Sequence, residues 1–371
     1  MDHANTLRSF SRLCWIAVRS GSAEAVMVVS VPQTAGSSSE GKSSGEAGPL
    51  PTRPPRAGLP AWSDRVGGLR VDGDVEQDFE VAKRSAAVDL VGVDLVKELA
   101  LTPERREQLS TWLSDMQLLR AEYPNVADYL SRTERMPGTG DSQSDLAFDV
   151  RLLHYLTGGR SAAENPYWAT VAPSVFDHDG RRVVNGGNPQ GSARLGYAEM
   201  FLQTAYSYAV PSPETIQWVV DFSDGRPILE LGAGRGYWAA QLSRAGLAVH
   251  AFELEPPDKA QNISFPHEAG QADVWYPVAS LDDLSLDACS NHVLLLCWPP
   301  GWGNTMASEA LDAFESVGGD RLIYIGEPRG GKTADEAFFD GLSARWTLDS
   351  SDPRFVSWWN LADSAHGWTR R

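Results

Sequence analysis

The 371-residue sequence has only three cysteines, Cys14, Cys289 and Cys297. Their number is odd and no two have CxxC spacing, so the sequence predicts neither a disulfide framework nor a metal site. Long apolar runs are missing too: Ala25–Val29 is far shorter than the roughly 20 residues of a membrane-spanning helix. We therefore expect no metal, no contact with a membrane and a cytoplasmic location.

Basic residues are also in short supply. Lys and Arg number 32 against 49 Asp and Glu, which gives a formal net charge of −17. Such a surface repels a polyphosphate backbone, so nucleic acid is a disfavoured partner. A neutral or cationic small molecule, or a basic peptide, fits this charge better.

The first part of the chain lacks a core-forming composition. Residues 1–20 carry Arg8, Arg12 and Arg19 with a single acid, which gives a weak likeness to an organellar transit peptide, but a disordered tail is the preferred interpretation of this composition. Residues 34–61 are mainly Ser, Gly and Pro, which cannot bury enough apolar surface to offset chain entropy. We predict a tail and linker over 1–66.

Helical spacing follows the linker. Thr102 can cap a helix whose first residue is Pro103, and apolar residues then recur at helical intervals, at 109, 112, 113 and 116. A second helix is predicted over 145–157, and the Gly-, Asn- and Pro-rich stretch 158–191 predicts a long loop or small ribbon. We predict a mainly helical substrate-side region over 67–195.

Strands and helices alternate over the remaining residues, 196–371. The pattern predicts strands at 227–231, 248–253, 273–278, 292–297 and 321–326, and helices at 213–221, 237–245, 305–316 and 333–343. Strands as apolar as HVLLLC and RLIYIG are typical of a parallel sheet that is covered on both faces. Two short pieces, 345–348 and 367–370, are predicted to pair antiparallel at its edge.

The sequence PILELGAGRGYWAAQL, 227–242, joins a strand to a helix through three glycines. Glycines at such a turn let the backbone approach a ligand without a Cβ clash. The G-x-G-x-G spacing differs from the dinucleotide pattern G-x-G-x-x-G, and Glu230 before it opposes a pyrophosphate but suits a cationic ligand. Glu253, 21 residues after Gly232 at the end of the next strand, can accept hydrogen bonds from both hydroxyls of a ribose.

These segments resemble motif I and the ribose-binding acid of class I S-adenosylmethionine-dependent methyltransferases. YAVPSPETI, LLLCWPPGWGNTMASEAL, RLIYIGE and TADEAFF extend the resemblance over about 196–371, to a little-characterised group with a Trp-Pro-Pro motif. It implies an α/β, Rossmann-like fold with a seven-stranded, mostly parallel sheet of order 3-2-1-4-5-7-6, and S-adenosyl-L-methionine as the cofactor. The residues it implies for the methionine part are Glu230, Gly232, Ala233, Gly234 and Gly236, with Glu253 on the ribose.

The loop CWPPGW, 297–302, lies where the methyl acceptor is expected, at the carboxyl edge of the sheet. Trp298, Pro299 and Pro300 occupy the place of the Asn-Pro-Pro-Tyr signature of amino-group methylases, but Trp298 replaces the amide, so nucleobase or glutamine methylation is not implied. Trp298 and Trp302 could wall an acceptor. Glu327, at the end of the fifth strand, is the candidate base, while Tyr206 and Tyr208 are candidates to line the cofactor pocket, with packing roles as the alternative.

One competing motif remains. GEPRGGKT, 326–333, satisfies the phosphate-loop pattern G-x-x-x-x-G-K-T, but Glu327 and Pro328 add a negative charge and remove an N–H donor. A capping box of Thr333 with Glu336 explains the hydroxyl without a nucleotide. The leading hypothesis is thus methyl transfer to a small molecule or peptide, and the alternatives are a cofactor-binding scaffold without turnover and a nucleotide-binding protein.

Overall fold

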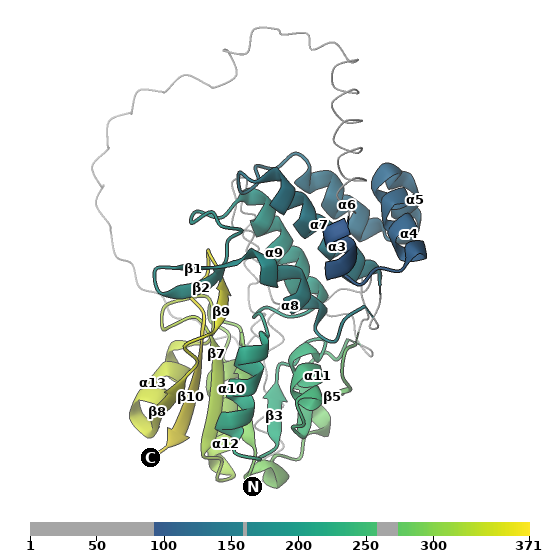
Figure 1. Cartoon of the computed structure of the whole chain (residues 1–371). Helices are drawn as coiled ribbons and strands as arrows, with labels where there is room; N and C mark the ends of the chain where they lie inside the picture. Colours follow the sequence, from purple (N-terminus) through teal and green to yellow (C-terminus); the bar gives the residue numbers. More distant parts are fainter. Residues whose placement is uncertain (1–92, 159–161, 258–273) are drawn as a thin grey trace, which may run out of the picture. The chain divides into compact units, whose positions relative to one another are not determined.

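The structure is a computed structural model that describes residues 93–158, 162–257 and 274–371 (Figure 1). The predicted tail and linker, with the three arginines of the transit-like segment and Cys14, lie outside the described residues. All described residues belong to one compact unit. Among them, no helix is long and apolar enough to cross a membrane.

The first described elements are helices: α3 (Val93–Glu98), α4 (Pro103–Ser114), α5 (Met116–Glu122), α6 (Pro124–Thr133), α7 (Ser142–Thr157) and α8 (Pro166–Val171). Thr102 caps α4 as predicted, since its hydroxyl accepts a hydrogen bond from the N–H of Arg105 at 3.2 Å. Asp115 ends α4 and caps α5 with its carboxylate. The apolar residues predicted on one helix, at 109, 112, 113 and 116, therefore lie on two helices, α4 and α5.

A small sheet follows. Strands β1 (Val175–His178) and β2 (Arg181–Val184) form an antiparallel ribbon, and β9 (Val356–Trp358) from the end of the chain pairs parallel with β2. The ribbon predicted within 158–191 is confirmed, while β9 was not predicted. The next helix, α9 (Ala193–Ala205), contains the predicted boundary at 195/196.

The main sheet has seven strands, in the order β5-β4-β3-β6-β7-β10-β8. Their bounds are β3 Ile228–Leu231, β4 Val249–Glu253, β5 Val278–Ser280, β6 Val293–Cys297, β7 Arg321–Gly326, β8 Trp346–Ser351 and β10 Ser364–Arg370. The first five pair in parallel, and β10 is antiparallel to β7 and β8. The predicted mostly parallel, seven-stranded sheet and its antiparallel edge pair are confirmed.

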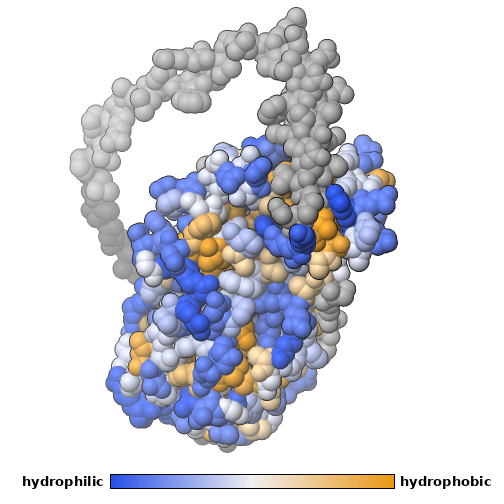
Figure 2. Space-filling model, in the orientation of Figure 1, coloured by the Kyte–Doolittle hydropathy of each residue, from blue (hydrophilic) through white to orange (hydrophobic). Residues whose placement is uncertain are grey.

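Both faces of this sheet are covered, which explains its continuous apolar strands. Ile228 packs in the cluster that includes α10 (Pro213–Ser223) and α11 (Tyr237–Arg244), while the adjacent Leu229 packs against α12 (Met306–Ser316) and α13 (Glu336–Arg345). Each such fully buried aliphatic side chain contributes about 1.5–3 kcal/mol. On the face seen in Figure 2, by contrast, hydrophilic side chains surround only small apolar patches.

Two predicted elements were wrong in their bounds. The strand predicted over 273–278 enters the sheet only at Val278, and its first residue lies outside the described ranges. The helix predicted from Thr333 begins at Glu336, after Asp335 at its N-cap. The capping box was also wrong, because the Thr333 hydroxyl is bonded to the N–H of Glu327 and to the Tyr324 hydroxyl instead.

Candidate functional site

The glycine turn connects β3 to α11 at the carboxyl edge of the sheet. Gly232, Gly234 and Gly236 have φ values of +79°, +54° and +70°, in the left-handed region that residues with a Cβ adopt only under strain. A Cβ at Gly236 would also lie 2.9 Å from the Tyr276 carbonyl oxygen. The N–H groups of Gly232 and Ala233 donate to the Phe252 carbonyl, so the turn is held against the end of β4. The spacing of the glycines therefore follows from backbone geometry.

Glu230 lies beneath this turn, 2% exposed. Its carboxyl accepts a hydrogen bond from the N–H of Ala239 in the first turn of α11, while Oε2 has no partner among the described residues. Burial, assisted by the nearby negative charge of Glu253, raises the pKa of Glu230 to about 8. A buried acid with a free acceptor oxygen is costly in isolation and suits a cationic hydrogen-bond donor.

Glu253 ends β4 with its carboxylate on the same turn. Oε2 accepts a hydrogen bond from the N–H of Gly234, and Oε1 accepts one from Leu254, both at 2.9 Å. Burial raises the pKa of Glu253, although these donors oppose the shift. The N–H of Glu255 also bonds to this carboxylate, so Glu253 retains acceptor capacity for one further hydroxyl group. The two acids that the sequence singled out thus lie at one turn.

Trp298 follows β6 and is held in a strained conformation, with φ at +53°. Its backbone N–H donates to the Ile325 carbonyl at 2.7 Å, and its indole Nε1 donates to Asp363 Oδ2 at 3.0 Å. Tyr208 stacks on the indole, with ring centroids 5.5 Å apart. A left-handed non-glycine residue costs about 1–2 kcal/mol, which these contacts offset. The side chain of Trp298 is therefore buried and fixed in orientation, at the position where the sequence predicts a wall of the acceptor site.

Pro299 and Pro300 tie the same loop to the segment after β7. The N–H of Ala334 donates to the Pro299 carbonyl at 3.0 Å, and Pro300 forms a bridge with Thr333. Trp302 lies beyond this anchor and is 66% exposed. The two predicted tryptophan walls therefore differ, since Trp298 is packed and Trp302 faces solvent.

Glu327 has a structural task that its sequence context did not indicate. Oε2 accepts the N–H of Lys332 at 2.6 Å, and Oε1 accepts the N–H of Ala362 at 3.2 Å. Both oxygens hold backbone donors of two loops, so Glu327 has a structural role in addition to the predicted role as a base, which stays a prediction. The bond from Lys332 to Glu327 puts a carboxylate inside the loop 326–333, where a phosphate-binding loop would hold phosphate. Thr333 is 1% exposed, and its hydroxyl is bonded within the protein, so it is not free to hold magnesium. This geometry disfavours the nucleotide-binding alternative.

Tyr206 differs from its predicted role as a lining residue. It has no exposed surface, and its ring packs against those of Tyr167, Tyr237 and Trp275 at centroid distances of 5.0–5.6 Å. Its burial favours the alternative of a packing role, and a role in the cofactor pocket stays a prediction. Tyr208, half-buried against Trp298, remains the candidate at the site.

Two acids near this edge escaped the sequence analysis. Asp363 lies between β9 and β10, 3% exposed, and burial raises its pKa to about 6. Glu199 lies on α9, 5% exposed, and burial raises its pKa to about 7. Asp363 is in no recognisable motif. Glu199 lies on the same face of α9 as the apolar residues Leu195, Ala198 and Leu202, and this position in the sequence could have indicated a buried acid.

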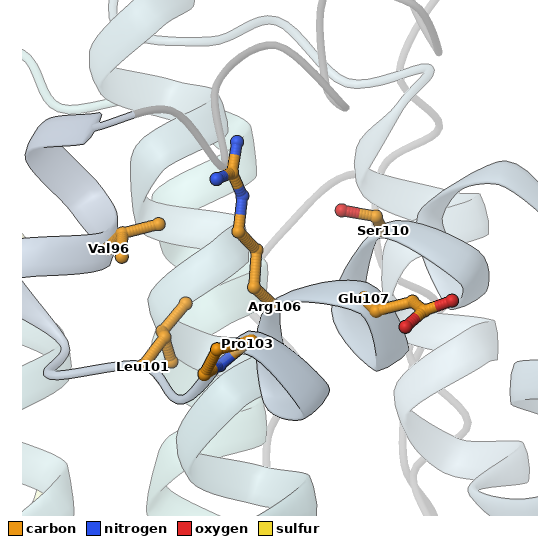
Figure 3. A pocket seen from close by; sticks show the side chains of 6 residues that line it. All are labelled: Val96, Leu101, Pro103, Arg106, Glu107 and Ser110. Atoms are coloured by element: carbon orange, nitrogen blue, oxygen red, sulfur yellow. The ribbon is translucent and has the colours of Figure 1, made fainter.

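Away from these residues, a pocket of about 380 Å³ lies between α3 and α4 (Figure 3). Its wall combines apolar and charged side chains, which are those of Val96, Leu101, Pro103, Arg106, Glu107 and Ser110. None of the predicted site residues lines it. Within the described residues, no group of three His, Cys, Asp or Glu could hold a metal ion.

No known family model matches the sequence, and no curated protein matches it. Solved structures with some likeness include magnesium protoporphyrin IX methyltransferase from Synechocystis with bound SAM, at 13% identity and TM-score 0.30, over 47% of this chain and 81% of that one. Mitomycin 7-O-methyltransferase MmcR has 17% identity and TM-score 0.30, over 80% of this chain and 97% of that one. The CcbJ methyltransferase of Streptomyces caelestis has 16% identity and TM-score 0.27, over 43% and 94%.

Proposed function

We propose that this protein binds S-adenosyl-L-methionine and transfers its methyl group to a small molecule. The observation that carries the proposal is the unpartnered, buried oxygen of Glu230 beneath the glycine turn. The ammonium and sulfonium groups of the cofactor are the kind of cation that such an oxygen lacks. Glu253, at the end of β4 and bonded to the same turn, would accept a hydroxyl of the ribose.

The sheet supports the same proposal. Numbered along the chain within the main sheet, the seven strands have the order 3-2-1-4-5-7-6, with the last strand antiparallel, as the sequence resemblance implies. Ligands of open parallel sheets bind outside the carboxyl ends of the strands, where the order reverses. Here that point lies between β3, which contains Glu230, and β6, which leads to Trp298.

When bound, the cofactor would supply an electrophilic methyl group. The chain would then align the acceptor and exclude water, which are the main demands of a methyl transfer. Gly232, Gly234 and Gly236 would let the backbone approach the methionine part, with Ala233 in the same turn. Trp298, fixed by Asp363 and Tyr208, would form the wall against which an acceptor lies, on a loop stiffened by Pro299 and Pro300.

Calorimetric titration with S-adenosylhomocysteine tests the cofactor part. We expect binding by the wild type and by Asp221→Asn, a matched charge change on an exposed position of α10. Binding should be lost in Gly234→Arg, whose side chain would enter the turn, and weakened at least tenfold in Glu253→Ala. Full affinity in Gly234→Arg would exclude the turn as the site.

Turnover separates an enzyme from a scaffold. Release of S-adenosylhomocysteine from the labelled cofactor in a metabolite extract is expected for the wild type and not for Gly234→Arg. Binding without such release in extracts and peptide mixtures would favour the scaffold. ATP binding that Lys332→Ala abolishes, without binding of S-adenosylhomocysteine, would instead establish the nucleotide-binding alternative.

A further inference from the structure

Two histidines lie together at the amino edge of the main sheet, which is the edge opposite the glycine turn. His250 is the second residue of β4, and His292 directly precedes β6. Leu229 on β3 pairs with both His250 and Leu294, so the two histidines flank the first residues of β3. Their ring centroids are 5.0 Å apart, and the ring planes meet at 68°. The fold therefore brings together two imidazoles from strands that β3 separates.

The ring of His292 is buried without hydrogen bonds. The residue is 7% exposed, and neither ring nitrogen has a partner among the described residues. A neutral imidazole carries one donor and one acceptor, and leaving both unpaired away from water costs free energy. Because nearly all buried polar side chains in proteins have a partner, these two nitrogens indicate a ligand that the described residues do not provide.

His250 connects this buried ring with the solvent. Its side chain is exposed, and within the described part of the chain its ring packs only against that of His292. An exposed side chain that no hydrogen bond holds can change its rotamer at little cost. A small rotation of the His250 ring can therefore point one nitrogen of each ring at a shared ion.

The charges around the pair leave His292 free to act as a ligand. Burial, together with the neighbouring imidazole of His250, lowers the pKa of His292, so its ring is neutral at neutral pH. The neutral imidazole is the form that binds a metal. The guanidinium of Arg226 donates to the His292 carbonyl at 3.0 Å and also to Asp320 at 2.7 Å. The positive charge next to the pair is thus offset by a carboxylate.

We propose that His250 and His292 bind a divalent ion of the zinc, nickel and copper group, with water in its remaining positions. Imidazole suits these metals, whereas Mg²⁺ and Ca²⁺ prefer oxygen. Two imidazoles that bind one zinc ion at about 2.0 Å and near the tetrahedral angle have ring centroids about 5 Å apart, as this pair has. No third His, Cys, Asp or Glu of the described residues joins the pair, so the site is open. The expectation of no metal rests on the cysteines, whose spacing does not bear on this pair.

Such an ion would join the amino ends of β4 and β6 across β3. Because the unfolded chain does not hold the two rings together, binding stabilises the folded state by mass action. At a zinc concentration 100-fold above the Kd, the Tm should rise by about 5 °C. The pair lies at the sheet edge opposite Glu230 and Glu253, so this inference does not depend on the proposed function.

The test uses the full chain without a histidine tag, freed of metal with a chelator and titrated calorimetrically at pH 7.5 with Zn²⁺ alone. We expect binding by the wild type that is weakened at least tenfold in His292→Phe, which keeps a buried ring, and in His250→Gln, which changes an exposed side chain. His178→Gln is the matched control, since it removes a histidine next to an acid on β1, and it should bind as the wild type does. Mg²⁺ and Ca²⁺ should not raise the Tm of the wild type as Zn²⁺ does.

Electron paramagnetic resonance of bound Cu²⁺ identifies the ligands directly, because hyperfine coupling counts the imidazole nitrogens. We expect two nitrogens in the wild type and one in His250→Gln, whose Tm without metal should stay close to that of the wild type. Zinc affinity that is unchanged in both variants would place the ion elsewhere and overturn the proposal. Absence of zinc binding and of a Tm shift in the wild type would also overturn it, and would leave water or ring packing as the environment of His292.

Discussion

Replacing Glu230 by glutamine should remove a pH dependence from cofactor binding. Glu230 is buried beneath the glycine turn, and in the free protein its pKa is raised to about 8. An ammonium group placed against Oε2 is stabilised by the ionised carboxylate and hardly at all by the neutral acid. Binding near neutral pH must therefore expel the proton of Glu230.

The size of the effect follows from the ionised fraction. A carboxyl whose pKa is about 8 is ionised in about 1% of molecules at pH 6 and in about half of them at pH 8. The affinity for S-adenosylhomocysteine should thus rise about 50-fold between these two pH values. Glu230→Gln should bind about 10–100-fold more weakly than the wild type at pH 8, since it loses a charge-assisted hydrogen bond of roughly 1.5–3 kcal/mol.

Calorimetry measures both quantities. Titrations at pH 6, 7 and 8 give the slope of the binding affinity against pH. Titrations at pH 7 in buffers of different ionisation enthalpy give the number of protons released on binding. We expect close to one proton per site for the wild type and a smaller number for Glu230→Gln, where Glu253 is the remaining acid of the turn with a raised pKa. Equal slopes and equal proton release in the two proteins would refute the reasoning.

Three further substitutions test packing, one in the helical region and two around the candidate site. Asp149→Ala leaves Arg194 partly buried without its carboxylate partner, and urea unfolding should show a loss of about 3–5 kcal/mol. Trp298→Phe keeps a ring for Tyr208 but leaves Asp363 without the indole donor, so we expect a loss of about 1–3 kcal/mol with little change in affinity for S-adenosylhomocysteine by calorimetry. Ala334→Gly relieves a φ of +57° and should raise the free energy of unfolding by about 1 kcal/mol, measured in the same urea experiment.

The central sheet was predictable because its signals are local. HVLLLC and RLIYIG are continuous apolar runs since both faces of β6 and β7 are covered by helices, and periodicity alone reveals such strands. The turn between β3 and α11 was predictable for a similar reason, because left-handed backbone requires glycine at fixed positions.

Features that depend on distant partners were not predictable from the same patterns. Thr333 stands at a spacing that favours a capping box, but a tertiary bond to Tyr324 takes its hydroxyl and delays the helix to Glu336. Glu327 follows a strand as a catalytic acid would, yet its oxygens also hold the backbone N–H groups of Lys332 and Ala362. In both cases the competing partner is fixed only once the chain has folded.

The loop 359–363 shows why the candidate site is harder to predict than the fold. β9 and β10 lie in two different sheets, and this loop must cross between them. Its position brings Asn360 to Glu199 on α9 and Asp363 to Trp298 after β6. No local pattern links these residues, since 161 positions separate Glu199 from Asn360. The proposed acceptor side thus depends on the pairing of β2 with β9, whereas the proposed cofactor side needs only β3, its glycine turn and the adjacent strand β4.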